Sequence, residues 1–293
     1  MRSFELLVNP AAGQPAAAGR GLEVARYLRD AGALVTVTHT QSAEHGREVA
    51  TKASGRGSVV VAVGGDGTVG SLAGAVVTAG GILGFVPVGR GNDFARQLGI
   101  THDVAAVADL LLTGSVRPVD VIEVGDRIVV GSVYAGIDSL TSRLVNRVHR
   151  LPARLQYPIA ALGAIATHRS TEYRIAIDGV SRIVSAHTVI VANSGYYGSG
   201  MHVAPSARLD DGLLDIVIFA AAGRLRLLKA LRLIYRGTHL ELPEVTVQTG
   251  YAVAIDSTGP VEAYADGDRI GPLPVEVRVM AGALNVIAPS ITG

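Results

Sequence analysis

Residues 58–68 read SVVVAVGGDGT, an apolar β-branched run that ends in a glycine-rich turn. The run predicts a buried strand over Ser58 to Val63, and the pattern after it predicts a helix over Thr68 to Thr78. Glycines let main-chain amides approach phosphate oxygens, and a helix N-terminus favours negative charge. The turn Gly64 to Thr68 therefore predicts a phosphate site at the carboxyl end of a strand, where ligands of open α/β sheets bind.

Asp66 is the acidic residue of this turn. A carboxylate beside bound phosphates is unfavourable alone, and it makes sense if it meets a Mg²⁺ ion or a substrate hydroxyl. The alternative is an ordinary glycine-rich turn in which Asp66 caps the helix. We favour the phosphate site, because the whole pentapeptide directly follows a strand.

The first 120 residues alternate strand-like and helix-like runs around this turn. This rhythm predicts an α/β domain with a parallel sheet covered by helices, a Rossmann-like nucleotide-binding fold. We expect strands at Phe4–Val8, Ala33–Thr38, Ser58–Val63 and Ile82–Val86, with helices at Gly19–Ala31, Ala43–Ala53, Thr68–Thr78, Asp93–Leu98 and Val104–Leu112.

Further glycine-rich or polar segments follow other strands of the expected sheet. Asn9 and Gly13 follow the first strand, Thr40 follows the second, and the segment Pro87 to Asp93 follows the fourth. Because the carboxyl ends of parallel strands share one edge, we expect these segments to meet there. Each is weak evidence by itself, and a plain strand-to-helix turn is the alternative.

Strands dominate after Val119 and predict a β-rich C-terminal sandwich or half-barrel. Turn signals at Asp178-Gly179 and Asp266-Gly267 separate strand pairs. We therefore predict two domains, 1–120 and 121–293, and leave open that the last residues return to the first domain. Late strands are expected at Val275–Met280 and Ala283–Ile287, and helical stretches at Leu140–Thr167 and Leu225–Arg236.

Composition excludes several classes of protein. Lys plus Arg is 26 and Asp plus Glu is 25, and aromatic residues are 4%, which argues against a nucleic-acid module. Without cysteine, thiol catalysis and cysteine metal clusters are excluded. No secretory signal is recognised at the start, and no apolar window reaches about 18 residues, so a cytoplasmic protein without a membrane span is expected.

Carboxylates also gather in the second half of the chain. The segment Pro205 to Asp215 contains three of them before a strand, and could bind a hard cation through oxygen atoms. A charged β-turn is an equally good reading of that segment. Asp268 lies next to the Asp266-Gly267 turn, which needs no function as a hairpin.

Taken in order, these segments resemble the diacylglycerol kinase catalytic family, in particular its bacterial soluble lipid kinases. The likeness covers nearly the whole chain. The matching pieces are Asn9-Pro10 with Gly13, Gly64 to Thr68, Pro87 to Arg96, Gly136-Ile137-Asp138, Asn193, Gly195 to Gly200, Pro205 to Asp215 and Asp266-Gly267.

The resemblance implies an ATP-dependent kinase that transfers the γ-phosphoryl group to a lipid hydroxyl such as that of diacylglycerol, with ATP and lipid between two domains. It implies catalytic roles for Asp66, Asp93 and Asp215 in a Mg²⁺–water network, and for Asp268 as general base. Asp66 is left open as the alternative base. A second, structural Mg²⁺ would correspond to Asp211 with the carbonyls of Arg208 and Leu213. Residues expected at the nucleotide are Asn9, Gly13, Thr40, Gly64, Gly65, Asp66, Gly67, Thr68, Gly89, Arg90 and Asn92.

Some residues depart from the family pattern. Gly70 and Ser71 replace the usual amide and carboxylate, Arg90 replaces a threonine, and Asp268 replaces a glutamate. These departures leave two alternatives open: a kinase for a non-lipid or specialised hydroxyl compound, and a nucleotide-binding protein without turnover.

Two basic amphipathic stretches are compatible with peripheral contact with an anionic membrane, at its inner face. For each stretch alone, a solvated basic face on a packed helix is the stronger reading. A homodimer is left open. The stretches combine Arg143, Arg147, Arg150 and Arg154 with Leu140, Leu144, Val148 and Leu151, and Arg226, Lys229, Arg232 and Arg236 with Leu225, Leu228, Leu231 and Ile234.

Overall fold

The computed structural model describes residues 2–9, 15–89, 91–145 and 153–289. The chain divides into two compact units, of which unit 1 comprises residues 1–121 and 281–293 and unit 2 comprises residues 122–280. None of the described helices is long and apolar enough to cross a bilayer.

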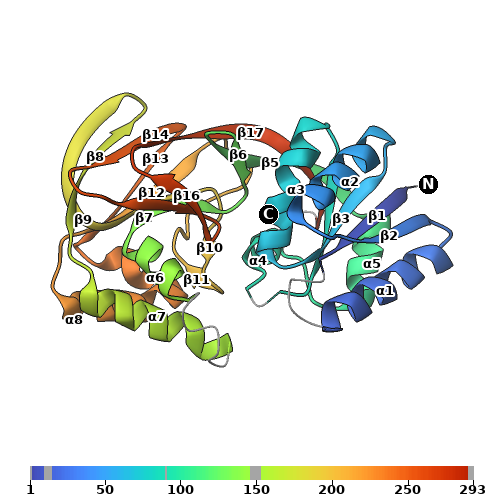
Figure 1. Ribbon diagram of the computed structural model, residues 1–293, viewed down its shortest axis with the longest axis horizontal. Coiled ribbons are helices and arrows are strands. Elements are labelled where there is room, and N and C mark those ends of the chain that lie inside the picture. Colours follow the sequence, from blue (N-terminus) through green and yellow to red (C-terminus); the bar gives the residue numbers. More distant parts are fainter. Residues whose placement is uncertain (1, 10–14, 90, 146–152, 290–293) are drawn as a thin grey trace. The chain divides into compact units, whose positions relative to one another are not determined.

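Unit 1 is an α/β layer structure, as the sequence predicted (Figure 1). Its parallel sheet has the order β17-β4-β3-β1-β2. Helices α1 and α5 pack together, and so do α2 and α3. Its elements are β1 (Ser3–Val8), α1 (Pro15–Asp30), β2 (Leu34–His39), α2 (Ala43–Gly55), β3 (Val59–Gly64), α3 (Asp66–Thr78), β4 (Ile82–Pro87), α4 (Asp93–Leu98) and α5 (Val104–Thr113).

The central strand of this sheet is β3, and all six of its residues are buried. A strand covered by helices on both faces has no solvated side, so an unbroken run of valine and alanine suits it better than an alternating pattern. Burial of this strand holds its carboxyl end, and the glycine-rich turn after it, in a fixed position at the edge of the sheet.

Unit 2 is β-rich, which confirms the predicted fold class. Its main sheet has the order β16-β15-β7-β9-β8-β14-β17, and β12 lies between β9 and β13. The elements are β6 (Arg127–Val129), β7 (Ser132–Gly136), α6 (Ile137–Val145), α7 (Ala153–Thr167), β8 (Thr171–Ile177), β9 (Val180–Ala192), β10 (Tyr196–Tyr197), β11 (Met201–His202), β12 (Leu214–Ala220), α8 (Arg224–Leu233), η2 (Ile234–Arg236), η3 (Thr238–Glu241), β13 (Val245–Gly250), β14 (Ala252–Ser257), β15 (Glu262–Ala265) and β16 (Asp268–Pro272).

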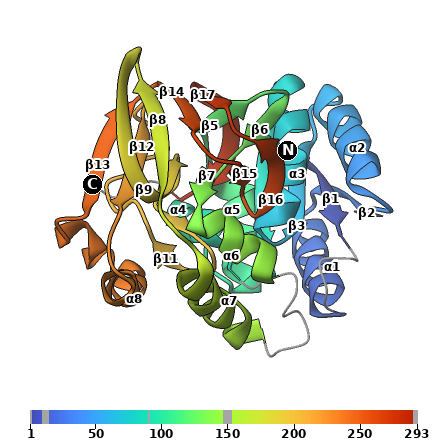
Figure 2. The same ribbon diagram turned by 60° about the vertical axis from the view of Figure 1, so that its left-hand side comes forward.

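Two apolar clusters stabilise unit 2. One includes Ile175, Val189 and Ile216, and the other includes Ile190 and Val217 together with residues of α8 and η2. Because side chains alternate along a strand, β9 and β12 contribute to both clusters from opposite faces. Helices α6 and α7 pack against each other beside the sheet (Figure 2).

The stretch Leu140–Thr167, predicted to be helical, contains more than one helix. It contains the two mutually packed helices α6 and α7, and residues 146–152 between them lie outside the described part. Apolar and basic residues recur at helical spacing through both helices, so the sequence pattern does not show where the first helix ends and the second begins.

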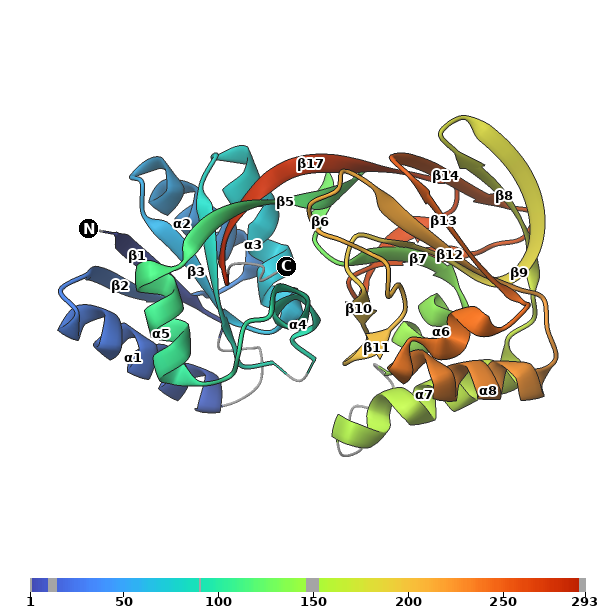
Figure 3. The ribbon, with the colours of Figure 1, turned by 180° about the vertical axis from the view of Figure 1, so that it is seen from behind.

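Two strands belong to both units, β5 (Ser115–Val124) and β17 (Val275–Ala288), and they pair with each other (Figure 3). The first half of β17 pairs with β14 in unit 2, and Asn285 and Val286 pair with β4 in unit 1. The prediction of two strands here was wrong. Gly282, whose φ is +61°, looks like a turn residue, but its N–H donates to Asp120 Oδ1 at 2.7 Å and the strand continues.

His239 is a buried titratable side chain in unit 2. It is 0% exposed and stacks on Phe219, and its Nε2–H donates to the Val203 carbonyl at 3.0 Å. Burial lowers its pKa from 6.5 to about 4, against the opposing effect of the hydrogen bond. Between pH 6.5 and pH 4, the histidine therefore binds a proton in the unfolded chain but not in the folded protein. The free energy of unfolding decreases as the pH falls through this range.

We expect the free energy of unfolding to fall between pH 7 and pH 5 by about 2 kcal/mol more in the wild type than in His239→Gln. Glutamine keeps a donor for the Val203 carbonyl and does not titrate. Urea unfolding at both pH values measures this, and the other histidines cancel because both proteins contain them. Equal losses in the two proteins would show that His239 does not carry the acid sensitivity.

Candidate active site

The carboxyl ends of four strands of unit 1 are aligned at one edge. Val8 at the end of β1 pairs with His39 of β2 and Val63 of β3, and Gly64 pairs with Pro87 of β4. The segments that follow these strands therefore begin side by side. Thr40 is tied to this edge because its main-chain N–H donates to the carbonyl of Val8 at 2.9 Å.

The glycine-rich turn and the loop after β4 touch through their backbones. The Val88 N–H donates to the Gly64 carbonyl at 2.8 Å. A Cβ on Gly89 would lie 2.5 Å from the Gly65 Cα, and a Cβ on Gly65 would lie 3.0 Å from the Gly89 Cα. No side chain fits at these distances, so the two glycines are required for close contact between loops that are 24 residues apart.

Asn92 gives the second loop its shape. Its Oδ1 accepts the Gly89 N–H at 2.9 Å, and its Nδ2 donates to the Gly89 carbonyl at 2.8 Å. Its φ of +49° is left-handed, a conformation that asparagine tolerates better than most residues. Asn92 was predicted at the nucleotide, and it lies at this edge with its amide hydrogen-bonded to its own loop.

Asp66 joins the two loops. It is the first residue of α3, and the residue at the capping position is Gly65, which makes no side-chain bond. The Asp66 Oδ1 instead accepts the main-chain N–H of Phe94 at 3.0 Å. The alternative in which Asp66 caps its own helix is therefore wrong. Thr68 fills the space left by Gly64, where a Cβ would lie within 2.6 Å of the Thr68 Cβ.

Asp93 adds a second carboxylate at the start of a helix. It is the first residue of α4 and is buried, and the Arg96 Nε lies 3.9 Å from its Oδ1. Asp66 and Asp93 thus each begin a helix at the same edge, from adjacent loops. Gly13 and Arg90, also predicted at the nucleotide, lie outside the described residues, and Asn9 directly follows β1.

In unit 2, Asp215 is a buried carboxylate on β12. Its Oδ1 accepts the Ser206 hydroxyl at 2.5 Å. Burial raises its pKa, and the nearby Asp211 raises it further, whereas the Ser206 bond opposes the shift. A carboxyl group with a raised pKa is a frequent property of functional sites, and also of structural networks.

The residues implied for a structural Mg²⁺ lie in the loop before β12. The Asp211 Oδ1 accepts the Leu213 N–H at 3.0 Å, and the Arg208 Nε lies 3.3 Å from Asp210. One carboxylate and two main-chain carbonyls are hard oxygen ligands of the kind Mg²⁺ takes, so the donor chemistry fits. Within the described part of the chain, no group of three or more His, Asp or Glu side chains could hold a metal ion.

Asp268 begins β16 and is exposed, next to a turn whose main role is structural. In that turn, Asp266 and Gly267 have φ of +46° and +96°, and they join β15 to β16 as a hairpin. The Asp266 carboxylate accepts the N–H groups of Val130, Gly131 and Ser132 at 2.8 to 3.2 Å. Asp266 therefore holds the start of β7 against the hairpin that presents Asp268.

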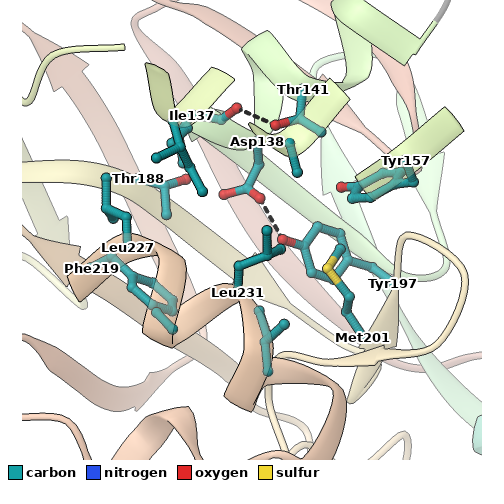
Figure 4. A pocket seen from close by; sticks show the side chains of 14 residues that line it. Ile137, Asp138, Thr141, Tyr157, Thr188, Tyr197, Met201, Phe219, Leu227 and Leu231 are labelled. Atoms are coloured by element: carbon teal, nitrogen blue, oxygen red, sulfur yellow. Dashed lines mark hydrogen bonds between the residues drawn. The ribbon is translucent and has the colours of Figure 1, made fainter. Parts of the chain in front are cut away.

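An apolar pocket with a carboxyl group in its wall lies in unit 2, between the sheet and the helices α6, α7 and α8 (Figure 4). Its volume is about 60 Å³. The Tyr197 hydroxyl donates to Asp138 Oδ1 at 2.5 Å, and Thr188 lies beside the same carboxyl group. Burial raises the pKa of Asp138, while the Tyr197 bond opposes the shift.

Sequence reasoning gave Asp138 no role, although Gly136-Ile137-Asp138 was among the matching pieces. The available signal was an acidic residue at the junction of an apolar strand and an amphipathic helix. What the sequence does not show is that Thr188 and Tyr197, each about 50 or more residues away, line the same pocket.

Comparisons with known proteins agree with this architecture. Residues 3–124 match the diacylglycerol kinase catalytic domain, and residues 131–288 match the YegS C-terminal NAD kinase beta sandwich-like domain. A diacylglycerol kinase of Mycobacterium tuberculosis (strain ATCC 25618 / H37Rv) is 32% identical over 291 residues, which cover 97% of this chain and 94% of the relative. The chain belongs to the diacylglycerol kinase family.

Two further comparisons give lower sequence identities. A diacylglycerol kinase of Bacillus subtilis (strain 168) is 24% identical over 294 residues, covering 99% of this chain and 97% of the relative. The crystal structure of a diacylglycerol kinase from Bacillus anthracis str. Sterne superimposes with a TM-score of 0.78 at 20% identity, covering 100% of this chain and 98% of that one, which shows the shared fold. As a member of the diacylglycerol kinase family, the protein is a kinase that phosphorylates an alcohol group.

Proposed function

We propose that this kinase uses ATP to phosphorylate the hydroxyl group of a membrane lipid such as diacylglycerol. The observation that carries the proposal is the backbone contact between Gly65 and Gly89, which brings two glycine-rich loops together at the carboxyl edge of the sheet. Main-chain amides at such an edge, next to the N-terminus of α3, are suited to hold nucleotide phosphates.

The carboxylates have distinct proposed roles. Asp66 and Asp93 in unit 1 would hold Mg²⁺ through water, and Asp215 in unit 2 is proposed as a further carboxylate of the phosphoryl-transfer chemistry. A bound magnesium ion offsets the charge that develops on the transferred phosphoryl group. Asp66 also orients the second loop through the Phe94 N–H, so it contributes to positioning as well as to charge. Asp268 is the proposed base for the attacking hydroxyl, because it is exposed on a hairpin that Asp266 holds in place.

The apolar pocket of unit 2 supports a lipid acceptor. Its walls are aliphatic and aromatic, with a few polar groups that converge at Asp138, a composition typical of small-molecule sites (Figure 4). We propose that it accepts part of the apolar chain of the substrate. An acceptor without an apolar chain would have no use for such a pocket.

The test is transfer of radiolabel from [γ-³²P]ATP to a total lipid extract, with mass identification of the product. We expect one labelled lipid phosphate, and we expect diacylglycerol in neutral detergent micelles to be labelled whereas glycerol is not. Label on glycerol or another small alcohol alone would favour the non-lipid alternative. ATP binding without transfer to any acceptor would favour a nucleotide binder and contradict the proposal.

A further inference from the structure

Two histidine rings lie next to each other in unit 2, apart from the carboxylates of the candidate active site. His168 directly follows α7, and His187 lies on β9. Their ring centroids are 5.6 Å apart, and the ring planes are tilted by 55°. Histidine is the commonest metal ligand among the side chains, so a close pair of histidines is a candidate ligand set.

A β-bulge directs the side chain of His187. Phe219 of β12 pairs with Thr188 of β9. The next residue of β12, Ala220, pairs with Ala186, which leaves His187 as an extra residue in β9. Bulges re-aim side chains and are frequent next to functional sites. The bulge therefore sets the direction in which the His187 ring leaves the sheet.

The loop before α8 orients the His187 ring. The residue is buried, with 5% of its surface exposed. Its Nε2 lies 2.9 Å from the Ala222 carbonyl oxygen and 3.1 Å from the Ala222 main-chain nitrogen. The shorter contact is a hydrogen bond in which Nε2–H donates to the carbonyl, and this tautomer leaves a lone pair on Nδ1. The His187 Nδ1 is buried and has no hydrogen-bond partner in the described ranges.

The His168 ring has the same arrangement with its two nitrogens exchanged. Burial lowers the pKa of His168, the neighbouring His187 ring lowers it further, and a hydrogen bond to the His187 main chain opposes the shift. A main-chain group that raises the pKa of a histidine is a carbonyl that accepts an N–H. The His168 Nε2 is buried without a partner among the residues that the structure describes, so Nδ1–H is the donor and Nε2 carries a lone pair. The neutral ring is the form that binds metal.

Each ring thus donates one N–H to a main-chain carbonyl and keeps one buried lone pair. Metal-binding histidines have this arrangement, because the carbonyl fixes the tautomer and directs the other nitrogen at the metal. With Zn–N bonds of about 2.0–2.1 Å and a tetrahedral angle, two imidazole rings on one ion have centroids roughly 5–6 Å apart. The observed 5.6 Å lies in this range. The C-terminus of α7, just before His168, adds partial negative charge that favours a cation.

We propose that His168 and His187 bind a divalent transition-metal ion such as Zn²⁺, through the His168 Nε2 and the His187 Nδ1. Imidazole nitrogen suits Zn²⁺, Ni²⁺ and Cu²⁺, whereas Mg²⁺ takes oxygen ligands. Two protein ligands are fewer than a closed structural zinc site has, so water molecules complete the coordination. We expect reversible binding in the micromolar range. This binding does not depend on the proposed function.

A bound ion would connect three segments that contribute to the apolar pocket. Ile165 of α7 and Thr188 of β9 line that pocket, and each lies within three residues of one of the histidines. Ala222, which orients His187, directly precedes the loop into α8, and α8 lines the pocket through Leu227. The ion would therefore stabilise the folded arrangement of unit 2 and hold the walls of the pocket in place.

A water molecule is the other occupant that two bare nitrogens could share. One water can donate an O–H to each of two acceptors, and buried waters commonly satisfy groups of this kind. A pair of histidines that holds only water would bind no zinc, so a zinc titration separates the two occupants.

Isothermal titration of the full-length, untagged protein with Zn²⁺, without ATP or lipid, tests the proposal. Excess Mg²⁺ in the buffer occupies sites that consist of oxygen ligands. We expect one Zn²⁺ per chain, and Zn²⁺ should raise the urea concentration at which the protein unfolds. His168→Gln and His187→Gln should each abolish that rise and weaken binding at least about 100-fold, because losing a group that only orients a ligand already costs about 10- to 100-fold.

His202→Gln is the matched control in the same unit. The His202 ring stacks on Tyr196, and His202 is close to His239. This variant should bind Zn²⁺ as the wild type does. Loss of binding in His202→Gln, with binding retained in His168→Gln and His187→Gln, would place the ion at His202 and contradict the proposal.

X-ray absorption at the zinc edge identifies the ligands of the wild type without any substitution. We expect two imidazole nitrogens at about 2.0–2.1 Å and oxygen ligands in the remaining positions. Urea unfolding without metal checks that each variant is folded. A wild type that binds no zinc, or a spectrum with oxygen ligands alone, would show that the proposal is wrong.

Discussion

Gly89→Ala is expected to reduce phosphoryl transfer about 100-fold. The added Cβ would lie 2.5 Å from the Gly65 Cα and 2.8 Å from the Asn92 Oδ1. Non-bonded carbon atoms prefer separations of about 3.5–4.0 Å, so the two loops must move apart by about 1 Å. A displacement of that size at a site of phosphoryl transfer can cost about 100-fold in rate. Steady-state transfer to micellar diacylglycerol measures the loss.

Gly55→Ala is the matched control for this variant. Gly55 ends α2 in the same unit, and no heavy atom lies within 4 Å of the position of its Cβ. We expect activity equal to that of the wild type and stability that is equal or higher by up to about 1 kcal/mol. Unfolding in urea should show Gly89→Ala still folded at the assay temperature. A folded Gly89→Ala protein with full activity would contradict the role of the loop contact.

Asp66→Asn is expected to lower kcat by about 100- to 1000-fold, the range observed when one preorganised electrostatic group is removed from an active site. Asparagine has the size of aspartate and keeps an oxygen that can accept the Phe94 N–H. The substitution therefore removes charge and leaves the link between the two loops. Single-turnover transfer and urea unfolding, measured on the same preparation, separate the two effects.

Two further variants serve as comparisons: Asp66→Ala removes the hydrogen-bond acceptor as well as the charge, and Asp109→Asn is the control for loss of charge. Alanine removes both the charge and the acceptor, so Asp66→Ala should lose the activity and also about 1–3 kcal/mol of stability. Asp109 is exposed on α5, outside both loops, and Asp109→Asn removes the same charge without an expected effect. If Asp66→Asn keeps wild-type kcat, Asp66 acts only through the Phe94 contact and its proposed catalytic role fails.

The alternation of strands and helices in unit 1 could be predicted because each element has a strong local pattern. The valine run of β3 is continuous, which is typical of a strand buried on both faces, and glycines mark its end. Parallel strands then place their carboxyl ends together without further information. The meeting of the first, second, third and fourth strands at one edge thus follows from topology alone.

The sequence pattern was less informative where neighbouring segments of similar composition form separate elements, or where one element continues past a turn-like residue. The helices α6 and α7 read as one helical stretch, because apolar and basic residues recur at helical spacing through both. In β17 the opposite error occurred, because Gly282 looks like the end of a strand. Its N–H is satisfied by the Asp120 carboxylate, 162 residues away, and no local rule contains that partner.

For the candidate site as well, some features could be predicted from the sequence and others could not. The types of residue needed for phosphate binding, and their order, are readable from the sequence, as is the hairpin at Asp266-Gly267. The reasons for particular residues are not. Gly65 and Gly89 look like flexible turn residues, and the structure shows that they are the contact point of two loops. Asp266 looks like a turn residue, and it accepts three main-chain N–H groups of another strand.

The sequence by itself determined that this protein is an α/β domain followed by a β-rich one, with a glycine-rich loop at a strand end. Those features depend on periodicity and turn chemistry, which act between residues close in the chain. Only the tertiary structure decided that Asp66 bonds to Phe94 and that Asp138 lies in an apolar pocket with Tyr197. Burial and hydrogen bonding depend on which distant segments pack together, and that packing gives a carboxyl group its partner and its pKa.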